Sequence, residues 1–537
     1  MATITIDPIT RIEGHLKIEV VTDAGEVKEA RCSGTLYRGF EQIMVGRHPL
    51  DAPIITQRVC GVCPAVHATA SAQCIDAAFG IAANVPRNGR ILRNLILAAN
   101  YLQSHVLHFY HLAALDYVDV TKAARYRGSD PALASIKDFI KRGELAPFAP
   151  RYEGDYRLPD KVDREAVSHY VQALEMRRRA HEMLSIFGGK MPHQCGIVAG
   201  GVTSGPNADQ IADFMWRLNQ IRDFISGVYL PDVIAVAKAY PDYAGIGAGV
   251  GRWLSYGVFD SGTTDLPVEA RERFLPQGVA GADPSTGSEP ALSNAKGQVL
   301  QVADVDERAI TEEVATSWFE YSDGAGGKHP SVGETAPAPD KAGGDSWLKS
   351  PRYHGKPYEV GPLARMIVAY ARGIKPVKAA VDGLLAQLKA GPEALDSVLG
   401  RHAARALEAK LVADAMVQWL IQLKPGEPFC AAQDIPQTGQ GAGLVDGPRG
   451  ALGHWTTLAD GRVAHYQLVV PTTWNASPAD SLGQPGPIEQ ALLGTKIRDE
   501  QNPFEVVRIV RSFDPCLACA VHLITPAGRE LAGFRVL

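Results

Sequence analysis

The hydrophobic and polar positions of the chain follow a period of two near its start and a longer period through its middle. Apolar and polar side chains alternate in "TITID", "LKIEVVTD" and "EVKEARCSGTLY", around the turn-forming "DAGE". This alternation predicts strands over the first 40 or so residues. From residue 86 to residue 115, apolar residues recur every three or four positions, which is typical of an amphipathic helix. Further helices of several turns are predicted at 164–187, 208–228, 360–388 and 401–423.

After about residue 427 the pattern returns to short strands. The stretch "GALGHWTTLADGRVAHYQLVVP" predicts a hairpin with "ADGR" at its turn. Two segments rich in Gly, Ser, Pro and Asp, at 276–296 and 322–346, are expected to be long loops. The pattern therefore predicts an α+β fold, mainly α, in which a large helical core carries small β-sheets from the N- and C-terminal segments. Such a fold brings the two ends of the chain together.

Composition narrows the class of protein. The chain has 537 residues, of which 46% are hydrophobic and 21% charged, with a net charge of −5. This mild negative charge provides no basic face, so nucleic acid is not an expected partner. No stretch reaches the roughly 18 uninterrupted apolar residues of a membrane helix. The start, "MATITIDPITRIEGH", lacks the pattern of a signal peptide, so export would depend on another chain.

Cysteines supply the strongest chemical signal. The 8 cysteines are too few for a disulfide scaffold of this length. Two of them stand in "RVCGVCPAVH" as Cys60 and Cys63, and two in "DPCLACAVH" as Cys516 and Cys519. Each C-x-x-C presents two thiolates from one turn, which suits a soft metal ion or a redox disulfide. The others show no cluster-binding spacing and are expected to be small apolar residues of the core: Cys32, Cys74, Cys195 and Cys430.

The distance between the two pairs distinguishes among metal sites. Four thiolates complete a tetrahedral site, so structural zinc, a catalytic metal and redox disulfides all fit the count. Structural zinc usually closes a short segment, with about 15 to 20 residues between pairs, whereas about 450 residues intervene here. A chain of this size does not need a metal to fold. The spacing therefore favours a buried reactive centre, and the charged residues and histidines beside each pair are what such a centre requires around its ligands.

Both cysteine motifs resemble the terminal signatures of the large subunit of nickel–iron hydrogenases. "PITRIEGH", "TLYRGFE", "GPRGALGHW", "YQLVVPTTWN" and "SFDPCLAC" resemble other blocks of that family in the same order, from residue 7 to residue 537. The block "YLQSHVLHFYHLAALDYVDV" is similar to uptake enzymes of the periplasmic or membrane-associated type. The resemblance implies one domain over 1–522, strand-rich at 1–45, helical at 88–425, and strand-rich and metal-binding at 427–522. Residues 523–537 would be a maturation peptide that is cut off after His522.

The resemblance also implies roles for individual residues. Cys60 and Cys516 would be terminal nickel ligands, and Cys63 and Cys519 would bridge nickel to an iron that carries carbon monoxide and cyanide. Around this centre, the family pattern implies a proton relay at Glu13, and an arginine over the open metal position, Arg449, with Asp514 as its partner. It also implies a hydrogen bond from His67 to Cys63. Pro448, Pro471 and Thr472 would form a pocket for the diatomic ligands. A second site for magnesium, or iron in some relatives, would use Glu41, the main-chain carbonyl of Leu468, and His522.

Without the resemblance, several of these residues have ordinary interpretations. Glu13 would be a solvated acid at a strand end, and Arg449 would be an arginine in a turn. His105, His108 and His111 fall on one predicted helix, and we expect them to serve packing and hydrogen bonding.

The implied activity is the reversible heterolytic cleavage of H2 into protons and electrons. No remaining cysteines have the spacing of an iron–sulfur relay, so electrons would leave through an iron–sulfur small subunit in a heterodimer. Further expected partners are a maturation endopeptidase, nickel-insertion factors and a membrane cytochrome. The mature protein is expected on the periplasmic side, membrane-associated through its partners, and its precursor in the cytoplasm. The alternatives are a hydrogen sensor or a catalytically silent subunit of a redox complex with the same fold.

Overall fold

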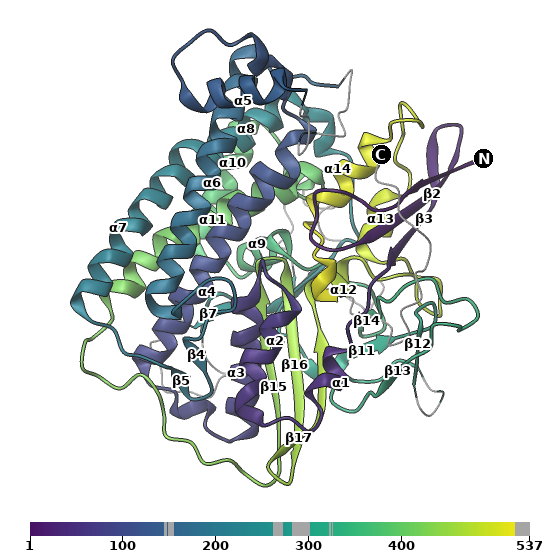
Figure 1. Ribbon diagram of the computed structural model, residues 1–537. Coiled ribbons are helices and arrows are strands. Elements are labelled where there is room, and N and C mark those ends of the chain that lie inside the picture. The colour runs from purple at the N-terminus through teal and green to yellow at the C-terminus, as the bar shows by residue number, and fades with distance from the viewer. Residues whose placement is uncertain are drawn as a thin grey trace.

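The computed structural model describes residues 1–143, 148, 155–260, 272–281, 301–321, 324 and 326–520. Residues 519 and 520 are described by their backbone only. Its helices form one body in which long helices lie side by side (Figure 1). α4 packs against both α6 and α11, and α7 packs against the same two helices. The helices of this body are α4 (Arg87–Leu107), α5 (Pro131–Lys141), α6 (Asp160–Gly188), α7 (Ala208–Phe224), α8 (Leu230–Ala239), α9 (Pro362–Ala371), α10 (Lys375–Leu388) and α11 (Val398–Ile421). The predicted α+β, mainly α, class is confirmed.

Two helix predictions need correction. The single helix expected at 360–388 is wrong, because α9 ends at Ala371 and α10 begins at Lys375. Gly373 adopts a left-handed conformation with φ 71° between them, and a proline in the first turn of α10 prevents continuation of α9. The helix expected from 86 to 115 is regular only to Leu107 and continues as a π-helical turn, His108–Ala113.

Two antiparallel sheets come from the chain ends, as predicted. The first joins β1 (Ala2–Ile6), β2 (Leu16–Asp23) and β3 (Glu26–Gly34) in sequence order. The second joins β15 (Gly439–Gly447), β16 (Gly450–Ala459) and β17 (Arg462–Val469), and it contains the predicted hairpin. Helix α3 (Pro64–Ala78) lies against β15. A Cβ atom at Gly443 would stand 2.0 Å from the Ala70 carbonyl oxygen, so glycine permits this close approach.

The chain also forms sheets between its ends, which the sequence analysis did not anticipate. They are built from short strands: β4 (Ile197–Val198), β5 (Gly201–Val202), β6 (Arg252–Ser255), β7 (Val258–Asp260), β8 (Arg273–Leu275), β9 (Gly278–Gly281), β10 (Val302–Ala303), β11 (Ile310–Glu313), β12 (Phe319–Tyr321), β13 (Thr335–Pro337) and β14 (Ser350–Tyr353). The expected loops at 276–296 and 322–346 are therefore interrupted by β9 and β13. Residues 282–300 lie outside the described part of the chain. These strands are too short for a period of two to become visible.

The two ends of the described chain pack together, as predicted. The Val27 amide donates to the Thr495 carbonyl oxygen at 2.9 Å, and β3 lies beside α13 (Pro487–Leu492) (Figure 1). The chain then continues through α14 (Phe504–Ser512) into the short helix α15 (Leu517–Ala520). The remaining short helices, α1 (Phe40–Met44), α2 (Ala52–Thr56) and α12 (Pro471–Asn475), lead to or flank the cysteine motifs. Among the described residues, no helix combines the length and apolarity needed to cross a membrane.

Candidate metal centre

Three sulfur atoms from the two cysteine motifs meet in the interior. The sulfurs of Cys60, Cys63 and Cys516 all lie within 4.8 Å of one another, and all three residues are buried. Cys60 Sγ and Cys516 Sγ are 3.4 Å apart, although 456 positions separate them in the chain. The side chain of Cys519, together with His522 and the tail 523–537, lies outside the described residues. A buried group of thiolates from two turns is a soft donor set for a transition metal.

Local structure prepares the first motif for this role. Cys60 follows a 3-10 turn, and Cys63 caps α3, whose first residue is Pro64. The amides of Val62 and Cys63 donate to Cys60 Sγ at 3.2 and 3.4 Å. Backbone N–H groups that point at sulfur favour the thiolate, which is the form that binds metal.

Glu13 lies against the second motif. Its carboxylate Oε2 accepts from the Cys516 thiol at 3.3 Å and from the Ala518 amide at 3.0 Å. The backbones of Glu13 and Cys516 form a parallel bridge. A Cβ atom at the neighbouring Gly14 would come within 2.6 Å of the Ala518 nitrogen, and Gly14 has φ 81°, so only glycine permits this approach.

Burial and the nearby Cys60 thiolate raise the pKa of Glu13. The glutamate is therefore a largely buried acid that is hydrogen-bonded to sulfur, and it is not the solvated acid that its sequence position alone would suggest.

Arg449 forms a buried ion pair with Asp514 near the sulfurs. Its Nη2 donates to Asp514 Oδ1 at 2.9 Å, its Nε donates to the Asp514 carbonyl oxygen at 3.0 Å, and its Nη1 donates to Ser104 Oγ at 3.2 Å. Burial opposes its charge, but Asp514 and the nearby thiolates raise the pKa of Arg449 well above its ordinary value. A fixed positive charge beside a group of thiolates stabilises their anionic form.

Asp514 turns the chain from α14 into the second motif. It has φ 57°, a left-handed conformation that is uncommon for residues other than glycine and is best tolerated by Asn and Asp. Two positions further on, the Cys516 amide donates to the Thr472 hydroxyl at 2.9 Å. Thr472 and the neighbouring Pro471 belong to α12, so that helix fixes the backbone of the second motif.

A second buried ion pair supports the turn that carries Arg449. Arg365 of α9 donates to both carboxylate oxygens of Glu408 of α11, and neither side chain is exposed to solvent. The remaining donors of Arg365 reach the carbonyl oxygens of Gly447 at 2.7 Å and Pro448 at 3.1 Å. The helical body thus fixes the two residues that precede Arg449. The sequence contained no signal for this pair, because both residues fall in ordinary helical patterns.

His67 has a partner that the sequence analysis missed. Its Nδ1 lies 3.3 Å from Nε2 of His454, whose Nδ1 is 2.8 Å from the Tyr466 hydroxyl. Tyr466 in turn donates to Ser71 Oγ at 2.9 Å. Burial lowers the pKa of His67 to about 4 and that of His454 well below its ordinary value, so both rings are neutral. The expected hydrogen bond from His67 to Cys63 stays a prediction.

Glu41 stands in a separate acidic pocket beside β17. Its carboxylate oxygens are each 3.2 Å from Lys349 Nζ, and its Oε1 accepts from the Leu468 amide at 3.3 Å. Glu312 lies 3.7 Å from the same lysine, and burial raises the pKa of Glu312 to about 7. The carboxylates of Glu41 and Glu312 both lie beside the Lys349 ammonium. Carboxylate oxygens are the ligands that a hard metal ion prefers. The third expected ligand, His522, lies outside the described residues.

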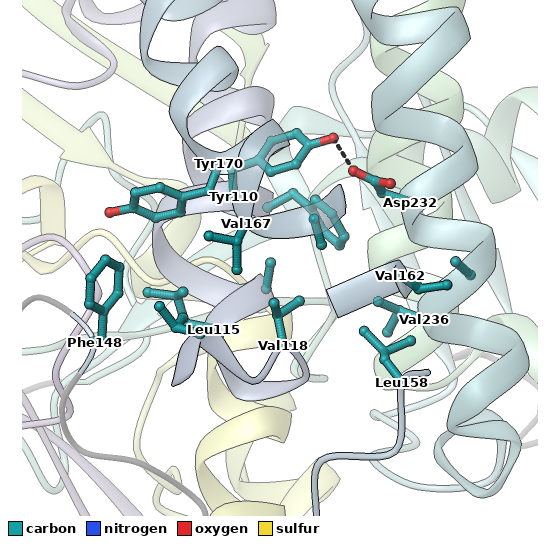
Figure 2. A pocket seen from close by; sticks show the side chains of 15 residues that line it. Tyr110, Leu115, Val118, Phe148, Leu158, Val162, Val167, Tyr170, Asp232 and Val236 are labelled. Atoms are coloured by element: carbon teal, nitrogen blue, oxygen red, sulfur yellow. Dashed lines mark hydrogen bonds between the residues drawn. The ribbon is translucent and has the colours of Figure 1, made fainter. Parts of the chain in front are cut away.

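The histidines of the π-helical region make hydrogen bonds of the kind expected of them. His105 pairs with Glu408 at 2.8 Å, His108 with the Arg511 carbonyl at 2.7 Å, and His111 with the Tyr170 carbonyl at 3.2 Å. An apolar cavity of about 20 Å³ lies next to this turn, and Figure 2 shows side chains such as Val167 and Val236 around it. None of the metal-centre residues lines this cavity.

Buried sulfurs from both ends of one chain, with an acid and an arginine beside them, form a donor set for a transition metal next to a helical body. Comparison with known proteins gives the family. The nickel-dependent hydrogenase family matches residues 38–522, and a family described as HoxL-like matches residues 3–33. The chain therefore belongs to the nickel-dependent hydrogenases, as a large subunit, and the resemblance drawn from its motifs is confirmed.

Individual relatives match over nearly their whole length. The periplasmic [NiFeSe] hydrogenase large subunit of Desulfomicrobium baculatum is 41% identical over 536 residues, which is 97% of this chain and 95% of that protein. The uptake hydrogenase large subunit of Bradyrhizobium diazoefficiens is 36% identical, over 99% of this chain and 97% of that protein. The structure of the H2-activated [NiFeSe]-hydrogenase of Dm. baculatum superposes with a TM-score of 0.83 at 42% identity, covering 97% of this chain and 100% of that chain.

Proposed function

We propose that this chain is the catalytic subunit of a nickel–iron hydrogenase that cleaves H2 reversibly into protons and electrons. The observation that carries the proposal is the meeting of three buried sulfurs, from motifs 456 residues apart, within 4.8 Å of one another. In this proposal Cys60, Cys63, Cys516 and Cys519 would hold nickel, and Cys63 and Cys519 would also be ligands of the iron. Selenium appears in the name of one relative, whereas the four proposed ligands of this chain are all cysteine.

The residues around the sulfurs suit this group. A nickel–iron centre, with carbon monoxide and cyanide on the iron, would supply the binding and heterolytic splitting of H2. Pro448, Pro471 and Thr472 would line the pocket of the diatomic ligands, and their burial supports a water-free lining. Arg449, held by Asp514, would present a fixed positive charge beside the thiolates and orient the substrate.

Protons would leave through Cys516 and Glu13. The thiol donates to the carboxylate over 3.3 Å, a distance across which a proton can pass directly. Burial raises the pKa of Glu13, which brings its affinity for a proton closer to that of the thiolate. Glu13 would therefore accept the proton from sulfur and pass it on.

A second metal, magnesium or iron, would bind Glu41, the carbonyl of Leu468, and His522. The proximity of Lys349 and Glu312 to Glu41 supports this site, since both can hydrogen-bond to water around a hard cation. The cation would fix the C-terminal end of the mature chain beside the sheet of β15–β17.

Electrons would pass to an iron–sulfur small subunit in a heterodimer. Four exposed apolar side chains lie on the segment that leads into the first motif, and we propose them as contacts of that subunit: Leu36, Ile43, Val45 and Ile54. The names of the relatives, large subunits of periplasmic and uptake hydrogenases, support a mature location on the periplasmic side, with membrane association through partners such as a cytochrome. Nickel-insertion factors would act on the cytoplasmic precursor.

Residues 523–537 would be removed after His522 by a maturation endopeptidase, leaving a mature domain over 1–522. Two comparisons support this boundary. The family match ends at residue 522. The alignment with one solved relative covers 100% of that chain but 97% of this one. We expect the intact mass of active, metal-loaded protein to correspond to a chain that ends at His522. Fully active protein that retains the tail would contradict this.

The test of the activity is metal analysis of the full chain produced with its partner and maturation factors. We expect nickel and iron in the protein, and infrared bands from carbon monoxide and cyanide bound to iron. Protein without nickel under these conditions would refute the proposal and favour a silent redox-complex subunit, an alternative that the four retained cysteines oppose. A hydrogen sensor would show the same metals with a different partner.

A further inference from the structure

We infer that Arg38 is the residue that sets the two cysteine motifs at their proper separation, because its guanidinium binds the backbone of both. The inference rests on the proposed function, since it concerns the geometry of the metal ligands. Arg38 touches no sulfur in the described contacts, so it is a positioning residue.

The contacts of Arg38 reach both ends of the chain. Its Nη1 donates to the Arg58 carbonyl at 3.2 Å, and its Nη2 makes a short hydrogen bond to the Val59 carbonyl. The same Nη2 donates to the Ala518 carbonyl at 2.6 Å, across 480 positions of sequence. Val59 immediately precedes Cys60, and Ala518 immediately precedes Cys519. One planar group is thus bound to the residue before the first cysteine of one motif and to the residue before the second cysteine of the other.

Apart from the contact between the sulfurs of Cys60 and Cys516, the other hydrogen bonds described at this junction each hold only one motif. Glu13 and Thr472 bind the amides of Ala518 and Cys516, and Arg449 binds Asp514. These contacts fix the second motif to the N-terminal segment, to α12 and to the turn after β15. Arg38 differs from them because its hydrogen bonds extend to the backbone of the first motif as well.

The chemistry of arginine suits this position. The guanidinium is planar and presents several N–H donors at fixed angles, so two nitrogens can bind three carbonyl oxygens at once. A lysine ammonium is a single point of charge on a flexible stem and cannot reproduce that geometry. The guanidinium also lies over the ring of Phe40, with its carbon 5.0 Å from the ring centroid. The intervening Gly39, at φ 68°, turns the chain so that Phe40 can start α1.

This arrangement predicts a local effect when Arg38 is lost. The motifs would stay folded, because β2, β3 and the helical body do not depend on the three carbonyl contacts. Their separation would become variable, and the four thiolates would hold a metal less well. Charge-assisted hydrogen bonds of this kind typically change local opening equilibria by about tenfold or more.

The test compares Arg38→Ala and Arg38→Lys with Arg47→Ala in the full chain, produced with its small subunit and maturation factors. Arg47 is a matched control, because it lies on the same segment, is exposed, and donates to the Ile43 carbonyl at 3.1 Å. The measurements are nickel per chain, hydrogen exchange of peptides covering 58–63 and 515–520, and thermal unfolding. We expect both Arg38 variants to lose nickel severalfold and to exchange about tenfold faster in those two peptides. We expect wild-type nickel content and exchange in Arg47→Ala.

Each result is decisive. Wild-type nickel content and exchange in Arg38→Lys and Arg38→Ala would overturn the inference. So would accelerated exchange spread over α4 and α11, because that would indicate general destabilisation. Exchange is measured without reference to activity, so it tests Arg38 even where nickel is absent. A wild-type chain without nickel would instead refute the proposed function.

Discussion

Replacing Glu13 with glutamine should block the exit of protons while leaving the metal centre intact. The amide oxygen of glutamine can still accept the hydrogen bond that the Ala518 amide makes at 3.0 Å, so the backbone pairing should survive. The amide cannot accept a proton from the Cys516 thiol at 3.3 Å and carry it onward. Losing a positioned acid–base group costs about 10² to 10⁴ in rate, or about 3 to 5 kcal/mol in the barrier. We therefore expect H2 oxidation to fall by this factor with unchanged nickel content.

Isotope exchange locates the lost step. Exchange between D2 and water requires protons to leave the site, whereas conversion of para- to ortho-hydrogen requires only that H2 be split and re-formed. Glu13→Gln should lose the first activity and keep the second. Glu13→Asp, whose carboxylate is withdrawn by about 1.5 Å, should be intermediate. Glu29→Gln, at an exposed glutamate on β3, is the control. Wild-type D2–water exchange in Glu13→Gln would refute the relay.

Three further predictions concern metal binding and stability. Cys60→Ser should abolish nickel binding, as measured by metal analysis, whereas Cys74→Ser, at a buried cysteine of α3 outside the site, should retain nickel. Glu408→Gln should lower the free energy of unfolding in urea by about 3 to 5 kcal/mol, because it removes the carboxylate that binds the buried Arg365 and leaves only Asp446, 4.0 Å away, as its anionic partner. Asp382→Asn, in an exposed ion pair, should change that free energy little, and equal effects would contradict the assignment. Burial raises the pKa of Glu489 to about 8, so its folded state binds a proton more tightly than the unfolded chain does. Stability should therefore fall by a few kcal/mol as pH rises from about 4.5 to about 8, and Glu489→Gln should flatten this dependence in urea titrations across that range.

Periodicity and local chemistry made much of this molecule predictable. The helices at 164–187 and 401–423 were visible because their apolar stripes run for many turns, and α6 and α11 match them closely. The cysteine pairs were visible because C-x-x-C is a compact signal. Arg38 and the Arg365–Glu408 pair, which support the site, were not visible. Arg38 binds carbonyl oxygens, which every residue carries, so no pattern of side chains marks its partners.

The buried ion pair between Arg365 and Glu408 escaped prediction for a related reason. Arg365 and Glu408 lie 43 positions apart on different helices, and charged residues in helices are usually exposed. The short central strands escaped prediction because pairing between segments, and not local preference, creates them. Local sequence thus identified which residues could bind a metal, whereas tertiary contacts determined which residues hold them in position.

The contact between Cys60 and Cys516 has a thermodynamic consequence for assembly. Closing a loop of 456 residues costs more chain entropy than closing the short loop of a zinc ribbon. For a flexible chain the difference is about 3 kcal/mol relative to a loop of about 18 residues. The unfolded chain therefore has little tendency to bring its four thiolates around one ion, and a metal that binds one pair early gains nothing from the other. Folding of the intervening helices removes this entropic barrier, so high affinity for the metal should arise only in a chain that is already folded.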